Sequence, residues 1–241
     1  MALGLGVVFD LDDTLYLERH YVASGFRSVA YMLSDSVGIE AETIYSYLMG
    51  LFRAGQRGQS FDRLLEEFPN ISRAYTVREL VNAYRMHTPR IRLLPTINTL
   101  LYSLRNAGIR LGLVSDGNLA SQRAKVEVLR LNSRLDLIVL TDAWGREYWK
   151  PHPRGFQYVE EVWGLGGPSL VYVGDNPAKD FVTPNRMGWW TVRLRLPGQL
   201  HYEEEPPKLL FAPEIEVSSV TELAKVLLST ETGSDGLETR S

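Results

Sequence analysis

The chain has 241 residues, of which 44% are hydrophobic and 23% are charged, values that are ordinary for a soluble globular protein. Its formal net charge of −3 provides no global basic field, so we expect no nucleic-acid partner, and an anionic substrate must be held by local groups. The absence of cysteine excludes disulfides, a thiolate nucleophile and a cysteine-based zinc site. This length suffices for one large domain or two small ones.

Neither end of the chain carries a targeting or membrane signal. There is no run of about 18 apolar residues, so we expect no membrane span. The opening residues, Met1 to Gly4, lack the basic region of a secretory signal, which makes the cytoplasm the default location. Residues 230–241 are rich in Ser, Thr, Gly and acidic residues, and this composition predicts a disordered tail.

The first predicted element is a strand, and a long helical stretch follows it. The apolar run Leu5 to Phe9 predicts a buried strand. Between Glu18 and about Arg92, apolar residues recur at helical spacing, with no convincing strand among them. The pattern predicts four helices, whose apolar sets are Phe26, Val29, Ala30, Leu33; Ile44, Tyr47, Leu48, Leu51; Phe61, Leu64, Leu65, Phe68; and Val77, Leu80, Val81, Tyr84.

After Pro95, strands and helices alternate, which indicates βαβ units and a parallel sheet. We therefore predict an α/β protein with a doubly wound, Rossmann-like core, formed by residues 1–15 and 94–229. An all-helical cap, residues 16–93, interrupts this core after the first strand. The expected helices cover 97–104, 119–131, 154–163 and 220–228, and the expected strands cover 109–114, 135–140, 169–173 and 189–194.

Polar residues with catalytic potential fall at the ends of these strands. Asp10 and Asp12 stand two apart, directly after the first strand, where open α/β sheets place their ligand crevice. Two carboxylates so close together are unfavourable unless a cation or a reaction uses them. Three further polar segments, which we expect to converge on the same crevice, are Ser115 to Asn118, Lys150 to Pro153 and Gly174 to Asp180.

This set of motifs resembles the haloacid dehalogenase superfamily, and within it the Mg²⁺-dependent phosphatases. The matching order is Asp-x-Asp-x-Thr at Asp10 to Thr14, then Ser115, then Lys150, then Gly-Asp-x-x-x-x-Asp at Gly174 to Asp180. The resemblance covers residues 5 to about 195 and the placement of the cap. Each motif alone is weak, but all four in this order and strand context are specific.

The resemblance implies a role for each carboxylate. Asp10 would attack phosphorus and form an aspartyl-phosphate, while Asp12 would protonate the leaving alcohol and then deprotonate the hydrolytic water. Mg²⁺ would be held by the side chains of Asp10 and Asp175 and by the backbone carbonyl of Asp12. Asp180 would either join the metal site or hold Lys150. Crowding beside Asp10 is expected to raise the pKa of Asp12, and Mg²⁺ to oppose that rise.

The resemblance also implies a phosphate cradle. Ser115 and the backbone N–H groups of Asp116 and Gly117 would donate to phosphate oxygens, and Lys150 would supply a compact positive charge beside the nucleophile. Thr14 is counted with these residues and is expected to tie the loop that follows the nucleophile.

The predicted cap would set the choice of substrate, since it can close over the crevice and contact the leaving group. A small phosphorylated metabolite such as a sugar phosphate is the expected partner, bound by a monomer or a homodimer. Tyr16, Glu18, Arg19 and Tyr21 are the candidate cap contacts, and Arg27, Arg53 and Arg57 are candidates for a second anionic group.

Three other functions remain open beside phosphate hydrolysis. A phosphate-binding or regulatory protein would keep the pocket without turnover, and a phosphomutase would share the same residues. A 2-haloacid dehalogenase is disfavoured, because dehalogenases of this superfamily lack the second acid and Asp12 is present. Asp13 stands where many relatives have Gly, and this substitution does not shift the prediction.

Overall fold

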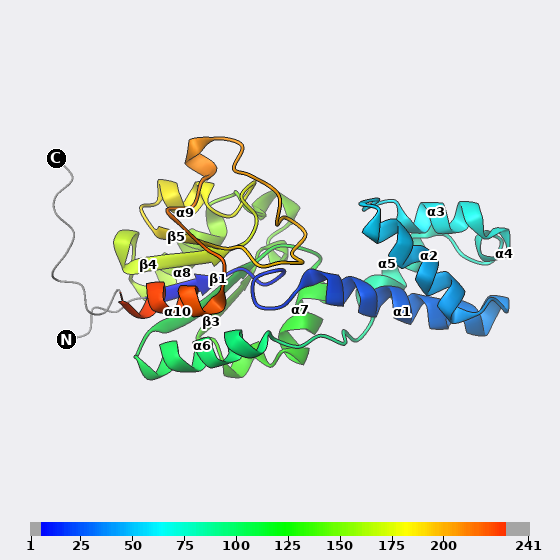
Figure 1. Cartoon of the computed structure of the whole chain (residues 1–241), viewed down its shortest axis with the longest axis horizontal. Coiled ribbons are helices and arrows are strands. Elements are labelled where there is room, and N and C mark those ends of the chain that lie inside the picture. The colour runs from blue at the N-terminus through cyan, green and yellow to red at the C-terminus, as the bar shows by residue number, and fades with distance from the viewer. Residues whose placement is uncertain (1–5, 230–241) are drawn as a thin grey trace.

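The computed structural model describes residues 6–229 and shows a parallel sheet beside a separate group of helices (Figure 1). The sheet has six strands in the order β3-β2-β1-β4-β5-β6, and every neighbouring pair is parallel. The predicted α/β Rossmann-like fold is therefore confirmed. The strands are β1 (Gly6–Phe9), β2 (Arg110–Ser115), β3 (Leu137–Leu140), β4 (Leu170–Gly174), β5 (Trp190–Leu194) and β6 (Ile215–Val217). The predicted tail and Met1 to Leu5 lie outside the described residues.

Strand β1 lies at the centre of the sheet, at the point where the strand order reverses. It pairs with β2 on one side and β4 on the other, and Phe9 is in register with both Leu113 and Val173. The backbone N–H of Asp10 continues this pairing and donates to the carbonyl of Val173 at 2.8 Å. The crevice of an open α/β sheet forms at such a reversal, beside the carboxyl ends of the strands.

Helices cover both faces of this sheet because the side chains of β1 alternate between them. Val7 and Phe9 pack into one apolar cluster with residues of α6, α7 and α10, whereas Val8 packs on the opposite face with Phe156 and Trp163 of α8. The helices of this part are α6 (Pro95–Asn106), α7 (Leu119–Val128), α8 (Arg154–Trp163), α9 (Val182–Arg186) and α10 (Val220–Ser229).

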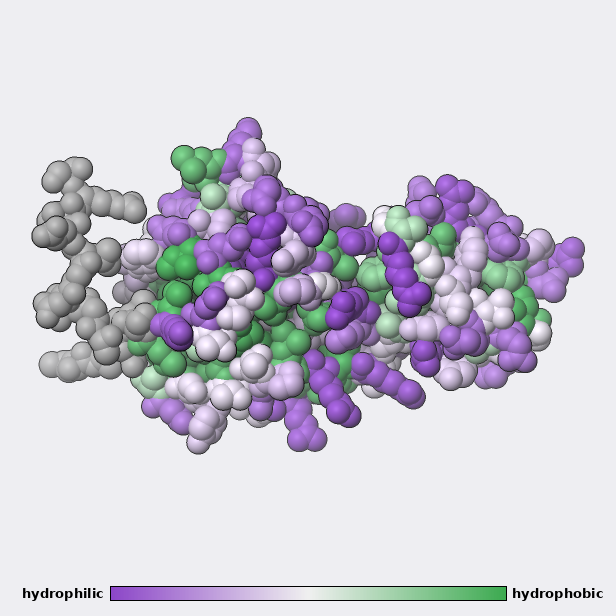
Figure 2. All heavy atoms as spheres, in the orientation of Figure 1, coloured by the Kyte–Doolittle hydropathy of each residue, from purple (hydrophilic) through white to green (hydrophobic). Residues whose placement is uncertain are grey.

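The remaining helices form a group at the opposite end of the molecule (Figure 1). They share an apolar cluster of their own, and in the space-filling view this group meets the rest of the protein at a narrower waist (Figure 2). The division into a core and a cap at residues 15/16 and 93/94 stays a prediction. The helices are α1 (Glu18–Val37), α2 (Ala41–Arg53), α3 (Ser60–Glu67), α4 (Pro69–Ser72) and α5 (Val77–Met86).

The observed elements differ from the predicted ones where periodicity gives little signal. Helices α4 and α9 and strand β6 were not predicted, because each is too short to show a pattern, and the helical stretch therefore has one helix more than the four predicted. The helix predicted to reach residue 131 ends at Val128, and Arg130 then adopts a left-handed φ of 53°. Among the described residues, no helix is long and apolar enough to cross a membrane.

Candidate active site

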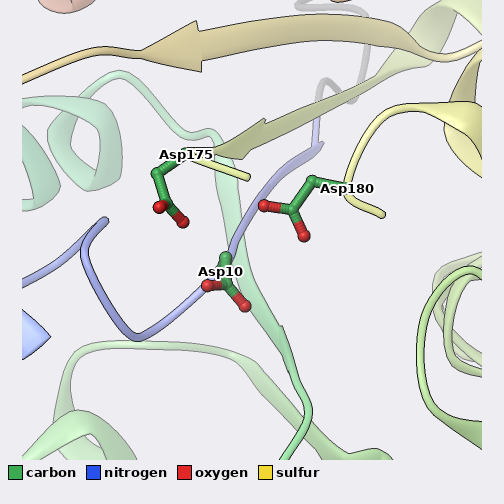
Figure 3. Close-up of side chains that lie close together, drawn as sticks. All are labelled: Asp10, Asp175 and Asp180. Atoms are coloured by element: carbon green, nitrogen blue, oxygen red, sulfur yellow. The ribbon is translucent and has the colours of Figure 1, made fainter. Parts of the chain in front are cut away.

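Three buried carboxylates meet at the carboxyl edge of the sheet (Figure 3). Asp10 follows β1, Asp175 follows β4, and Asp180 lies one turn further along the same loop. One ligand oxygen from each lies within 4.8 Å of the others. Oδ2 of Asp175 is buried and has no hydrogen-bond partner among the described residues, a costly arrangement that a cation would relieve.

These carboxylates fit a hard divalent cation. An all-oxygen set suits Mg²⁺, which is usually bound through one or two carboxylates together with substrate phosphate. Burial, with the neighbouring Asp180 and Asp10, holds the pKa of Asp175 well above its usual range. The side chain therefore lies where negative charge is already concentrated, and a positive ion there would favour its ionised form.

Lys150 links two of these carboxylates. Its Nζ donates to Oδ1 of Asp10 at 2.5 Å, to Oδ1 of Asp180 at 2.8 Å and to the hydroxyl of Tyr172 at 2.8 Å. Burial raises the pKa of Asp10 to about 6, although Lys150 opposes that rise. Asp180 is further engaged, because its Oδ2 accepts from the backbone N–H of Asn176 at 2.9 Å. Asp180 thus holds Lys150 and at the same time belongs to the acidic cluster.

Asp12 belongs to a second, separate polar cluster. Its carboxylate accepts from Lys125 Nζ at 2.7 and 2.9 Å, from Gln122 Nε2 at 3.0 Å and from the hydroxyl of Tyr16. Burial alone would raise the pKa of Asp12, but the charge of Lys125 and the hydrogen bonds of Lys125, Tyr16 and Gln122 together outweigh it and lower the pKa below its usual value. The expectation that crowding beside Asp10 raises this pKa is therefore wrong, since the nearest charge is the cation of Lys125.

The loop after β2 forms the next wall of the site. Ser115 is buried, and its hydroxyl makes only a long contact of 3.5 Å to the carbonyl of Asp116, so it remains available to a ligand. The carboxylate of Asp116 accepts from the backbone N–H of Lys150 at 3.0 Å and from the hydroxyl of Thr141 at 2.8 Å. Gly117 has a φ of 116°, and a Cβ there would meet Gln122 Nε2 at 2.5 Å, so glycine is required.

Asp13 joins the loop after β1 to two other segments. Its φ of 55° lies in the left-handed region, which glycine adopts freely and which Asp tolerates better than most residues. Its Oδ1 accepts from the backbone N–H of Glu18 at 2.7 Å, and its Oδ2 accepts from the backbone N–H of Leu200 at 2.6 Å. Asp13 thereby connects the start of α1 to the loop after β5.

These loops enclose a cavity of about 310 Å³. Lysines, carboxylates and aromatic rings share its wall, and burial together with Asp12 raises the pKa of Glu18 in that wall to about 7. The lining residues are Asp10, Asp12, Glu18, Tyr21, Tyr84, Arg85, Asp116, Gly117, Asn118, Ser121, Gln122, Lys125, Trp149 and Lys179.

The four candidate cap contacts have different positions. Glu18 and Tyr21 line the cavity, whereas Tyr16 is fully buried beneath it and donates to Asp12. Arg19 is exposed and lies against Gly198, outside the cavity lining. The hydroxyl of Thr14 is buried without a hydrogen-bond partner in the described part of the chain, so it does not tie the loop through a hydrogen bond.

The arginines proposed for a second anionic group also differ in their surroundings. The guanidinium of Arg27 lies over the ring of Tyr45, 4.2 Å from its centroid, and Arg53 is exposed. Arg57 lines a neighbouring cavity together with Glu18.

Sequence reasoning missed several residues that shape this site. Lys125 and Gln122 hold Asp12, Tyr172 holds Lys150, and Lys179 Nζ lies 3.3 Å from Oδ2 of Asp116. One signal was present in the sequence. Helix α7 begins two residues after Gly117, so its first two turns must face the edge of the sheet, and polar residues there are candidates for the site.

Comparisons with known proteins agree with this geometry. The family model of the haloacid dehalogenase-like hydrolases matches residues 7–193. The chain is 28% identical over 194 residues to the glyceraldehyde 3-phosphate phosphatase of Methanocaldococcus jannaschii, covering 78% of this chain and 84% of that one. It is 29% identical over 230 residues to the enzyme of the same name from Methanopyrus kandleri, covering 92% and 96%.

Solved structures show the same fold. The HAD hydrolase YfnB from Bacillus subtilis, crystallised bound to magnesium, superposes with a TM-score of 0.66 at 19% identity, covering 92% of this chain and 98% of that one. The chain belongs to the haloacid dehalogenase-like hydrolases. The family predicted from the four motifs, and the phosphatase class within it, are confirmed.

Proposed function

We propose that this protein is a Mg²⁺-dependent phosphomonoester hydrolase that acts on a small phosphorylated metabolite. The observation that carries the proposal is the ion pair between buried Lys150 and Asp10, because Asp10 lines the same cavity as Asp12. The relatives named as glyceraldehyde 3-phosphate phosphatases support a substrate of the sugar-phosphate class.

In the first half-reaction, an oxygen of Asp10 attacks phosphorus. The new bond joins that oxygen to phosphorus, while the bond from phosphorus to the leaving alcohol breaks and Asp12 donates a proton to the alcohol oxygen. A dianionic phosphate placed beside Asp12 favours the protonated form that this step needs. Lys150, held by Asp10 and Asp180, supplies fixed positive charge for the phosphoryl oxygens.

In the second half-reaction, Asp12 acts as a base. It removes a proton from the attacking water, whose oxygen forms a bond to phosphorus. The bond between Asp10 and phosphorus breaks, and inorganic phosphate is released. The ion pair with Lys125 suits this step, because it favours the carboxylate form of Asp12. Ser115 and the backbone N–H groups after it would hold the phosphate oxygens throughout.

The cation would be held by the side chains of Asp10 and Asp175 and by the backbone carbonyl of Asp12, with Asp180 behind them. When bound, Mg²⁺ supplies positive charge that offsets the charge on the phosphoryl oxygens. The unpartnered Oδ2 of Asp175 supports this placement. Asp175→Asn is expected to abolish the rise in melting temperature that Mg²⁺ gives the wild-type protein.

The second acid favours phosphate ester hydrolysis over dehalogenation. Cleavage of a carbon–halogen bond releases a halide that needs no proton, whereas an alkoxide leaving group needs an acid. Here Asp12 is present, lines the cavity and is held in place by three side chains. Such an arrangement serves the leaving alcohol of a phosphate ester.

The test is release of inorganic phosphate from a panel of phosphorylated metabolites that includes p-nitrophenyl phosphate and glyceraldehyde 3-phosphate. We expect turnover that requires Mg²⁺, is abolished by a chelator and returns when Mg²⁺ is added. Asp10→Asn should lower kcat by about 10³-fold or more. Asp62→Asn, which removes an exposed carboxylate on α3, is the matched control. Wild-type-like turnover in Asp10→Asn or in chelator would overturn the proposal.

A further inference from the structure

A second cavity of about 300 Å³ adjoins the first. Glu18, Tyr84 and Arg85 belong to the walls of both cavities, so the two spaces are neighbours that border on the same three side chains. The wall of the second cavity comes mainly from the helical group and is completed by Leu200, from the loop after β5. The other lining residues are Val22, Phe26, Phe52, Arg57, Gly58, Ser60, Phe61 and Val81.

Aromatic rings give this second cavity a firm apolar wall. The ring of Tyr84 packs against Phe26 and Phe61 with centroid distances of 5.7 and 5.9 Å, and Phe26 and Phe61 are themselves 5.9 Å apart. The two contacts of Phe61 are edge-on and the contact between Phe26 and Tyr84 is tilted, and such contacts fix the rings relative to one another. The remaining ring, Phe52, lies 5.5 Å from the guanidinium carbon of Arg57 at the cavity's outer side.

Charge is placed differently in the two cavities. The first is lined by carboxylates and lysines, whereas the charged residues in the lining of the second are Arg57, Glu18 and Arg85, and the last two are shared with the first cavity. A ligand that extends from Asp10 past Glu18 therefore passes from a charged space into an apolar one. The volume is ample for a ring, since an apolar cavity of about 150 Å³ binds benzene.

We propose that the substrate is a phosphate monoester whose alcohol carries an aromatic ring or an apolar body of similar size. This inference rests on the proposed hydrolysis of a phosphate monoester and departs from the sugar-phosphate class that the names of the relatives support. The phosphate lies at Asp10, the connecting carbons pass Glu18, and the ring fills the second cavity against Phe26, Phe61 and Tyr84. The three-carbon alcohol of a triose phosphate would leave this apolar space unfilled.

The experiment compares two esters that share a primary alcohol as leaving group, propyl phosphate and 3-phenylpropyl phosphate. Because their leaving groups are alike, a difference in kcat/KM reports contacts with the ring. We expect kcat/KM to be higher for 3-phenylpropyl phosphate by about tenfold or more, as burial of a phenyl group predicts. Ser60→Trp, which places an indole in the second cavity, should bring this ratio close to one.

Ser46→Trp makes the same substitution at an exposed position of α2 and should keep the wild-type ratio. A wild-type ratio near one, or an unchanged ratio in Ser60→Trp, would overturn the inference. Calorimetry with propylphosphonate and 3-phenylpropylphosphonate provides a readout that does not depend on turnover. If the whole metabolite panel and both esters released no phosphate, the proposed function would fall, while tighter binding of the phenyl compound, lost in Ser60→Trp, would still support the second cavity as its site.

Discussion

The carboxyl edge of the sheet and the helical group are built on different forces. At the sheet edge, ion pairs hold most of the buried carboxylates, with Lys150 between Asp10 and Asp180 and Lys125 on Asp12. In the helical group, an apolar cluster with packed aromatic rings holds the side chains in place without charge. The difference teaches that the proposed catalytic groups should be sensitive to substitutions that remove a charge. The proposed substrate-selecting surface should be sensitive to substitutions that change side-chain volume.

The largest expected effect is a loss of activity at the sheet edge, when the ion pair of Lys125 with Asp12 is removed. Lys125→Met leaves the carboxylate of Asp12 buried without its cation, so burial then raises the pKa of Asp12. Because the proposed mechanism uses the carboxylate form of Asp12 as a base, kcat near neutral pH should fall by about 10²-fold, and the acidic limb of the pH–rate profile should move to higher pH. Initial rates across pH measure both effects.

Lys125→Arg keeps the positive charge and should recover much of the lost rate. Lys208→Met removes an exposed lysine and serves as the matched control. A pH–rate profile in Lys125→Met that coincides with the wild-type profile would show that Asp12 does not depend on this ion pair.

The next largest effect is a loss of stability in the helical group, when its packing is disturbed. A Cβ on Gly25 would meet the Tyr84 ring at 2.3 Å, so Gly25→Ala must displace α5 or the aromatic wall. We expect the free energy of unfolding to fall by about 1–3 kcal/mol, as overpacking generally costs. Chemical denaturation measures this change, and the Mg²⁺-dependent rise in melting temperature should persist, because the carboxylate cluster is untouched.

The control is the same substitution at Gly50, in the interior of α2, where a Cβ meets nothing within 4 Å. Gly50→Ala should stabilise the protein by about 0.5–1 kcal/mol, since alanine is the better helix former. A loss of stability at Gly50 equal to the loss at Gly25 would show that the effect is not one of packing against Tyr84.

The smallest effect concerns the connection between the two parts. Nδ1 of His87 lies 2.6 Å from the carbonyl of Tyr84 and therefore donates to it, while Nε2 lies 3.1 Å from the hydroxyl of Ser24. That hydroxyl accepts from the backbone N–H of Arg90 and can donate its own proton to Nε2. Nε2 accepts this proton only while the ring is neutral, because a protonated ring carries a hydrogen on Nε2. Burial lowers the pKa of His87, and the bond to the Tyr84 carbonyl opposes this only in part.

The sign of the pH dependence follows from this lowered pKa. The unfolded chain takes up a proton near the ordinary value of 6.5, whereas the folded protein does so only at lower pH. The contribution of His87 to the free energy of unfolding is therefore fully present above pH 6.5. It is lost as the pH falls from 6.5 through the lower pKa that His87 has in the folded protein. Denaturation curves between about pH 5 and 7.5 should show a shallower pH dependence in His87→Gln than in the wild type, and parallel curves would refute this role.

The sheet edge was more predictable from the sequence than the rest of the site. Asp10, Lys150 and Asp175 follow strands whose order along the chain places them at one edge, so their meeting follows from fold class alone. Lys125 could not be paired with Asp12 in this way, because the position of α7 makes every polar residue in its first two turns a candidate and does not single out the lysine that reaches Asp12. The second cavity depends on how the helical group packs against the loop of Leu200, which local patterns do not encode.

Asp13 is a position at which one substitution would alter the second cavity. A glycine there would keep the turn but lose both hydrogen bonds, to Glu18 at the cavity junction and to Leu200 in the apolar wall. One substitution beside the nucleophile would thus loosen two walls of the more distant cavity while every reacting group kept its own contacts. A lineage carrying this chain could broaden or shift the compounds it accepts by a single codon change, without rebuilding its chemistry.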